Sequence, residues 1–126
     1  MNRPVFRTTQ NKGFQMRFDN GNTISIQFGT GNYCSRKDMN AVYGSEMSQE
    51  TIESDDAEIA IWKDGIGDHT NWFRFSYDTV LGHCTPDQVA MWISLVSSTN
   101  NFATLARKAL TMKLIDEDMY VDIDIH

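Results

Sequence analysis

An Asn-Gly pair between two alternating segments limits what this chain can fold into more than any other feature of its sequence. Residues 14–18, FQMRF, and residues 23–28, TISIQF, stand on either side of Asp19-Asn20-Gly21-Asn22. A tight hairpin turn needs residues that accept positive φ, and Asn followed by Gly meets that need best. Every second residue of both segments is apolar: Phe14, Met16, Phe18, Ile24, Ile26 and Phe28. The pattern predicts an antiparallel hairpin with one buried face and one wet face.

Further alternating segments predict more strands. Residues 57–62, AEIAIW, and residues 71–77, NWFRFSY, flank a glycine-containing turn and predict a second hairpin. Residues 4–8, PVFRT, favour a short strand near the N-terminus. Residues 118–125, DMYVDIDI, alternate again and favour an edge strand that pairs within its own sheet or with a neighbouring chain. Residues 35–56 are polar and have no clear period, and so long a gap in a compact domain is either disordered or functional.

The chain changes to a helical period after residue 84. Thr85-Pro86-Asp87-Gln88 predicts a helix start, because Thr caps the first turn, Pro fits the first helical position and Gln completes a capping box. An apolar stripe at helical spacing follows, formed by Val89, Trp92, Ile93 and Val96. Residues 97–101 stop this helix and cap a second one, whose stripe is Phe102, Leu105, Ala106, Ala109 and Leu110.

The order of these elements predicts the fold class. The chain is long enough for one real core, and we expect a single α+β domain over residues 1–126. We predict an antiparallel β-sheet of about five strands built from two hairpins, followed by two C-terminal helices packed on one face. Residues 118–125 are the candidate for a last edge strand.

Charge and hydropathy exclude several classes of partner. The net charge is −6 and the pI is about 4.8, and an acidic chain is a poor ligand for a nucleic acid polymer. No apolar segment approaches the length of a membrane span, and residues 1–10 lack the apolar region of a secretory signal, which together favour the cytoplasm.

The two ends of the chain carry opposite charge. Residues 1–17 are basic and residues 116–124 are acidic. These ends either stay solvated or pair across a subunit interface, and we expect a homo-oligomer.

The segment FGTGNYCSR, residues 28–36, follows a predicted strand and combines glycines with an aromatic residue and a cation. Its backbone N–H groups favour an anion nest, with Tyr33 and Arg36 as side-chain contributors. A nucleotide-binding loop normally opens a helix, however, and the residues that follow have no helical stripe. A glycine turn that closes the hairpin is therefore the alternative.

Trp72 and Arg74 repeat this chemistry on the strand predicted at residues 71–77. If Phe73 and Phe75 face the core, these two side chains lie on the wet face, where such a pair is typical of a recognition surface. The alternative buries Trp72 beneath the long loop or another subunit. Arg107, on the second predicted helix, is either a solvated cation near the helix C-terminus or a phosphate contact in a cleft between subunits. The predicted ligand-binding set is Tyr33, Arg36, Trp72, Arg74 and Arg107.

Catalytic and metal-binding patterns are weak. Cys34 and Cys84 predict two free thiols, and no CxxC or HxxxH spacing supports a metal site. His83 stands beside Cys84 just before a helix start, where a thiol of lowered pKa and an adjacent base suit a small cysteine-dependent hydrolase. No oxyanion-hole motif accompanies them. We therefore expect neither an enzyme nor a cofactor nor a metal.

The segment FQMRFDNGNTISIQFGTGNYC, taken with AEIAIW and TPDQVAMW, resembles small uncharacterised accessory proteins encoded by tailed bacteriophages. The resemblance rests on the spacing of the Asn-Gly turn and the GNYC motif, and on the order of strand and helix that follows. It implies an accessory gene product that acts in the cytoplasm of an infected bacterium. It carries no assigned catalytic residues, so no site is transferred.

The absence of reactive machinery predicts action by binding. The leading hypothesis is a non-enzymatic antagonist of bacterial immunity that sequesters a small nucleotide-type immune signal between subunits. Arg36, Arg74 or Arg107 would meet its phosphates, and Tyr33 or Trp72 would stack on its base. Direct blocking of a host defence protein through Trp72, residues 35–56 and the acidic tail is the second mechanism. The alternatives are a virion structural or assembly protein and the cysteine-dependent hydrolase.

Overall fold

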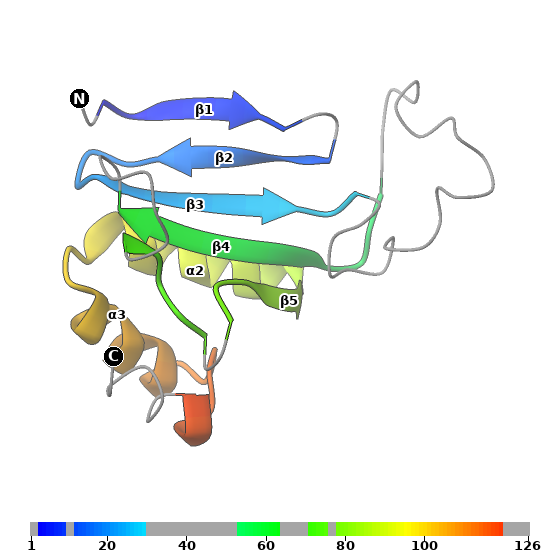
Figure 1. Cartoon of the computed structure of the whole chain (residues 1–126). Coiled ribbons are helices and arrows are strands. Elements are labelled where there is room, and N and C mark those ends of the chain that lie inside the picture. The colour runs from blue at the N-terminus through cyan, green and yellow to red at the C-terminus, as the bar shows by residue number, and fades with distance from the viewer. Residues whose placement is uncertain (1–2, 10–11, 30–52, 64–70, 76–77, 120–126) are drawn as a thin grey trace.

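The fold is an α+β arrangement, as predicted, seen in a computed structural model that describes residues 3–9, 12–29, 53–63, 71–75 and 78–119. Five antiparallel strands lie side by side in chain order (Figure 1). They are β1 (Val5–Thr8), β2 (Gly13–Arg17), β3 (Asn22–Gln27), β4 (Ala57–Lys63) and β5 (Leu81–Cys84). Two C-terminal helices follow, α2 (Pro86–Ser98) and α3 (Phe102–Thr111). The short strand expected at residues 4–8 is thereby confirmed.

The first predicted hairpin is confirmed in position and register. Phe14 lies opposite Ile26, and Met16 lies opposite Ile24. Gly21 closes the turn with a φ of 89°, a conformation that glycine adopts without strain. Since opposite residues of antiparallel strands share a face, these apolar side chains point to the same side of the sheet.

Both helices begin where their capping residues predict. The Thr85 hydroxyl accepts a hydrogen bond of 3.2 Å from the Gln88 backbone N–H, and the Gln88 side chain accepts one of 2.9 Å from the Thr85 N–H. Asn101 caps α3 by accepting from the Thr104 N–H at 3.0 Å. These contacts satisfy N–H groups that have no partner inside the helix.

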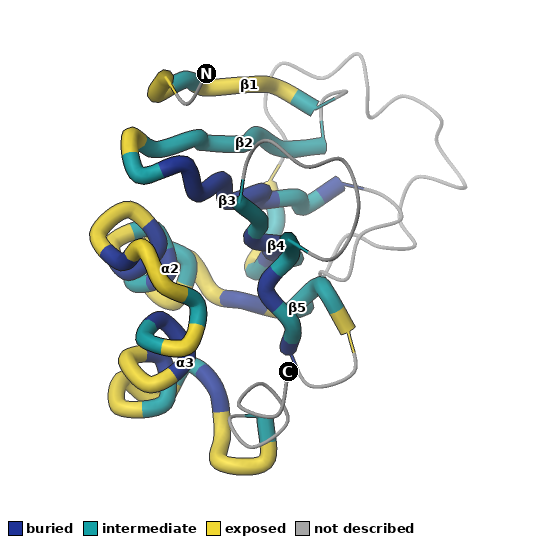
Figure 2. Tube along the Cα trace, turned by 60° about the vertical axis from the view of Figure 1, so that its left-hand side comes forward, coloured by how far each residue is buried: buried dark blue, intermediate teal, exposed yellow. Residues whose placement is uncertain are grey.

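The core lies between the sheet and the helices. α2 packs on β3 and β4, and α3 packs on α2 (Figure 1). The dark stretches of β3, β4 and α2 in Figure 2 mark the most buried part of the chain. Its largest fully buried side chains include Trp92, Phe73, Ile24, Ile59, Ile61, Leu105 and Val96. None of the helices in the described residues is long and apolar enough to cross a membrane.

The second predicted hairpin is only partly correct. Residues 71–75 approach β4 through an isolated bridge between Trp72 and Trp62, and Phe75 forms another with Asp78. The fifth strand of the sheet is instead β5, which pairs with the first half of β4 through Ala57 opposite Cys84. β5 was not predicted, because LGHC is short and has no alternation, and His83 adopts a φ of 56°. On the edge that does not pair with β3, β4 therefore pairs with β5 along its first half and with Trp72 at Trp62.

The predicted edge strand at residues 118–125 is wrong at its start. Residues 117–119 are helical, and the Asp116 carboxylate accepts a hydrogen bond of 2.9 Å from the Met119 N–H. Asp at this position caps a helical turn, and that local hydrogen bond outweighs the alternation of the residues that follow. Residues 120–125 lie outside the described residues.

Candidate functional site

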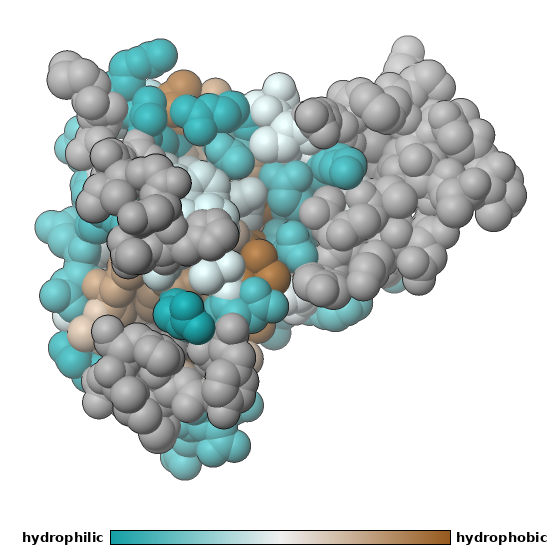
Figure 3. Space-filling view, in the orientation of Figure 1, coloured by the Kyte–Doolittle hydropathy of each residue, from teal (hydrophilic) through white to brown (hydrophobic). Residues whose placement is uncertain are grey.

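One row of side chains crosses the sheet on the face turned away from α2. In the register of the strands, Arg17 lies opposite Thr23, and Thr23 lies opposite Trp62. Trp62 in turn bridges to Trp72. Their sequence neighbours Ile24 and Ile61 are fully buried in the core, and successive strand residues point to opposite faces. Figure 3 views this face, on which hydrophilic residues gather over β1 and β2.

Trp62 and Trp72 form a stacked pair on this face. Their ring centroids are 4.9 Å apart with an interplanar angle of 20°, and both residues are half-buried. Phe73 fixes the orientation of the segment, because it is only 1% exposed and packs edge-to-face on Phe102 at 5.4 Å. The backbone N–H of Phe73 donates to the Ile61 carbonyl at 2.8 Å. Trp72 therefore points outward while its neighbour is buried.

Arg74 lies on the same side of the segment as Trp72. Phe73 and Phe75 are both buried, so the alternating residues Trp72 and Arg74 face the other way, and both of them are half-buried. The Nε atom of Arg74 is buried and has no hydrogen-bond partner among the described residues. A buried donor without an acceptor costs free energy, and an anionic oxygen is the acceptor that a guanidinium group binds best.

Arg107 lies elsewhere, on the exposed side of α3. Its Nη2 atom donates to the Thr104 hydroxyl at 3.2 Å. Both residues line a groove of about 290 Å³ together with Leu95, Lys108, Thr111 and Met112. Neither Trp72 nor Arg74 lines this groove. Trp72 and Arg74 therefore lie on the same side of one segment and Arg107 lies on α3, while Tyr33 and Arg36 lie outside the described residues.

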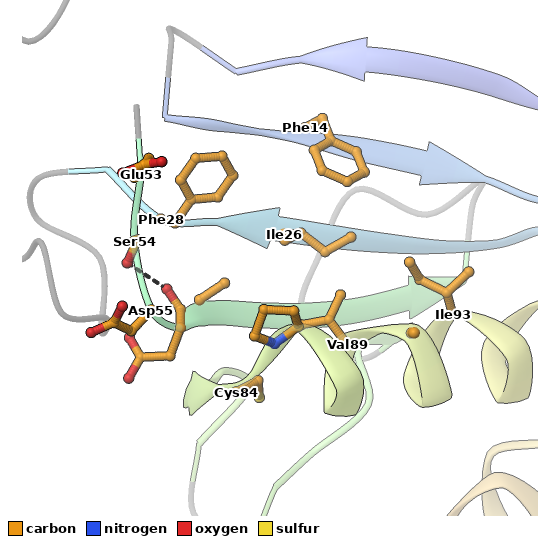
Figure 4. Close-up of a pocket in the computed structure, with 13 residues that line it drawn as sticks. Phe14, Ile26, Phe28, Glu53, Ser54, Asp55, Cys84, Val89 and Ile93 are labelled. Atoms are coloured by element: carbon orange, nitrogen blue, oxygen red, sulfur yellow. Dashed lines mark hydrogen bonds between the residues drawn. The ribbon is translucent and has the colours of Figure 1, made fainter. Parts of the chain in front are cut away.

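A larger hollow of about 940 Å³ lies on the opposite face of the sheet, beside α2 (Figure 4). Phe14, Ile26 and Phe28 line it from the sheet, and Val89 and Ile93 line it from α2. Its remaining lining residues are Glu53, Ser54, Asp55, Asp56, Ala57, Cys84, Pro86 and Ala90. The alternation of β2 and β3 predicts the apolar floor. The acidic segment 53–56 was not predicted here, because its place depends on how the chain returns to β4.

Cys84, in the wall of this hollow, does not have the lowered pKa that a cysteine nucleophile requires. Burial, together with the smaller effect of the negative charge of Asp56, raises the pKa of its thiol to about 11. The neighbouring imidazole is engaged elsewhere, because His83 Nδ1 lies 3.3 Å from Asp56 Oδ2. The expectation of a lowered thiol pKa is therefore wrong. Within the described segments, no cluster of three or more His, Cys, Asp and Glu residues is placed to hold a metal ion.

Comparisons with known proteins assign no family to the chain. No family model, no curated protein and no solved structure matches it. Functional inference therefore depends on the fold and on the side chains described above.

Proposed function

We propose that the chain is a non-enzymatic binding protein that antagonises bacterial immunity by sequestering a small nucleotide-type immune signal in the host cytoplasm. One observation carries the proposal. The Trp62–Trp72 stack lies on the face of the sheet turned away from α2, and Arg74, on the same side of its segment as Trp72, has a buried Nε donor without a partner among the described residues. An aromatic platform next to a guanidinium group matches the two chemical parts of a nucleotide.

Each part of the ligand has a corresponding protein group. The base stacks on the indole of Trp72, which Trp62 supports from the other side of the stack at 4.9 Å. A phosphate oxygen accepts the hydrogen bond that Arg74 Nε offers. Stacking of a base on an aromatic side chain contributes about 1–3 kcal/mol. A local cation can bind a small anion although the whole chain carries a net charge of −6.

Antagonism of immunity is supported by the resemblance to bacteriophage accessory proteins and by the chemistry of the described residues. Sequestration needs affinity and no reaction. Cys84, the nucleophile candidate that lies in the described residues, is buried and has a pKa of about 11, so it is protonated at neutral pH. A virion structural or assembly protein, the other class, would not need a buried arginine donor that lacks an acceptor among the described residues.

Calorimetry against a panel of cyclic and ADP-ribose-type nucleotides tests the proposal. We expect saturable binding to one class, with the nucleotide recovered chemically intact by mass spectrometry. Trp72→Leu and Arg74→Gln should each weaken binding by about tenfold or more, since each removes one of the two recognition groups. Arg3→Gln removes an exposed cation that precedes β1, which β2 and β3 separate from β4, and serves as the matched control.

Two results would overturn the proposal. If no nucleotide binds and the chain instead forms a stoichiometric complex with a host protein, direct blocking replaces sequestration. If a nucleotide is converted to product, the chain is an enzyme. Protection of an immune effector by the wild-type chain, lost together with nucleotide affinity in Arg74→Gln, would link binding to antagonism.

A further inference from the structure

β1 forms an open edge of the sheet. Within the described sheet the strands follow chain order, so β1 has a neighbouring strand on one side only (Figure 1). Three of its four residues, Phe6, Arg7 and Thr8, are exposed, and Figure 2 shows β1 as the exposed margin of the sheet. The backbone N–H and C=O groups along such an edge are a template on which another strand can pair.

The register of β1 shows which of its backbone groups face the open edge. The Thr9 N–H donates to the Gly13 carbonyl at 3.2 Å, which continues the β1–β2 pairing beyond Thr8. Hydrogen-bonded and non-hydrogen-bonded pairs alternate along antiparallel strands. Arg7 therefore also bonds to β2, whereas Phe6 and Thr8 direct their N–H and C=O groups away from it. Among the described residues, no hydrogen bond reaches these groups of Phe6 and Thr8.

The side chains of β1 set two conditions on a partner strand. Phe6 lies opposite Met16 on β2 and is 76% exposed, because α2 packs on β3 and β4. A partner must therefore supply an apolar side chain beside Phe6. It must also keep cations away from Arg7, because like charges directly opposite each other destabilise a strand pair.

β1 of a second copy meets both conditions. When two β1 strands pair antiparallel about a two-fold axis at Phe6, each Phe6 lies opposite the Phe6 of the other copy. Each Arg7 then lies opposite Val5, and each Thr8 N–H meets the carbonyl of Pro4. A pair centred on Arg7 would instead place two guanidinium groups opposite each other, so the charges select the register centred on Phe6.

β5, at the other edge of the described sheet, is less suited to pairing. His83 adopts a φ of 56°, and the register between β5 and β4 shifts between Ala57 and Ile59. Such irregularities interrupt a ladder and protect an edge from a further strand. Of these two edges, β1 is therefore the one that can add a strand of regular geometry.

We propose that the chain dimerises through β1, with the Phe6 rings of the two copies packed together at a two-fold axis. The axis stands perpendicular to the sheet, so the dimer has one continuous sheet with five strands from each copy. Both Trp62–Trp72 stacks lie on one face of that sheet and both helix layers lie on the other. The contact does not involve these stacks, so it does not depend on the proposed function.

Sedimentation over a dilution series tests the dimer. A pairing of two four-residue strands is a small interface, so we expect reversible association with a dissociation constant of about micromolar or weaker. Phe6→Thr should raise this constant by about tenfold without lowering the melting temperature of the monomer, because the ring is exposed. Met112→Thr removes the other exposed large hydrophobic side chain of the described residues, outside the interface, and should leave association unchanged.

Disulfide capture tests the register, in a chain that carries Cys34→Ser and Cys84→Ala. Residues of a hydrogen-bonded pair have Cα atoms about 5.5 Å apart, which suits a disulfide. Under mild oxidation Phe6→Cys should therefore link two chains. Thr8→Cys should not, because the two Thr8 residues are offset by four strand positions, about 13 Å. A wild-type chain that stays monomeric throughout the series, or Thr8→Cys linking as efficiently as Phe6→Cys, would overturn the proposal.

Discussion

The side-chain amide of Asn22, the first residue of β3, donates a hydrogen bond of 2.8 Å to the backbone carbonyl oxygen of Thr99, at the C-terminus of α2. A second bond of 3.0 Å reaches the Val96 carbonyl. Asn20 Nδ2 donates to the same Val96 oxygen at 3.0 Å. The last carbonyls of a helix have no partner inside it, so these amides satisfy groups that would otherwise be buried without a donor. The Asn-Gly turn thus joins the sheet to the helix.

Asn22→Asp should destabilise the fold by about 2–4 kcal/mol, because it replaces a donor with a carboxylate that faces carbonyl oxygens and the negative end of a helix dipole. Urea unfolding measures the loss. Asn20→Asp is the matched control and should cost less, since Asn20 is only half-buried whereas Asn22 is 0% exposed. Equal losses of unfolding free energy from the two substitutions would show that the buried amide of Asn22 contributes no more than the half-buried amide of Asn20.

Gly13→Ala should destabilise the fold by about 2 kcal/mol or more, because an added Cβ would stand only 2.0 Å from the Ile26 carbonyl oxygen of the neighbouring strand. The same substitution at Gly21, whose φ is 89°, costs only about 1 kcal/mol of backbone strain. Thermal or urea unfolding of both variants checks the order. A neutral Gly13→Ala would mean that β2 and β3 can separate locally.

Cys84 should make stability fall at high pH. Its pKa is raised from 9.0 to about 11 in the folded chain, so the folded state holds its proton more tightly than the unfolded state does. The contribution is fully present below pH 9 and is lost as the pH rises through 11, a change of about 3 kcal/mol. Urea unfolding under reducing conditions should show this decline in the wild-type chain. Cys84→Ala should show a smaller one, and parallel curves for the two would contradict the assignment.

Arg74→Met should leave stability unchanged or raise it by about 1 kcal/mol, because it removes a buried donor that has no acceptor among the described residues. The same variant should lose nucleotide binding. A residue whose role is to bind a ligand is expected to contribute to affinity while it lowers the stability of the unliganded fold. A strong loss of stability would instead assign Arg74 a structural role.

Local chemistry made the hairpin and both helices predictable. Asn20-Gly21 specified the turn, and Thr85 with Gln88 specified the start of α2. The outward orientation of Trp72 followed from alternation with Phe73. Non-local pairing decided the rest. LGHC forms β5 because it pairs with the first half of β4, whereas residues 71–75 bridge to β4 only at Trp62. Nothing in the sequence of LGHC indicates this pairing.

The site was predictable only where neighbouring residues form it. Trp72 and Arg74 share one extended segment, so period-two spacing alone places them together. Trp62 belongs to another strand, and its stack depends on a register that the sequence does not specify. Predicting the hollow would have required knowing that residues 53–56 line it together with α2. Predicting the role of Asn22 would have required knowing that the C-terminus of α2 lies beside this hairpin. Arg107 was included in the predicted ligand-binding set only because it is a cation, and it lies on α3, away from the segment of Trp72 and Arg74.

β3 and β4 are adjacent in the sheet, yet Gln27 and Ala57 are far apart in the sequence. Closing such a loop has an entropic cost that grows with the logarithm of its length, so doubling the number of intervening residues adds only about 0.6 kcal/mol. Lengthening the chain between these two strands, for example with a peptide tag, therefore adds little to the entropic cost of closing the loop.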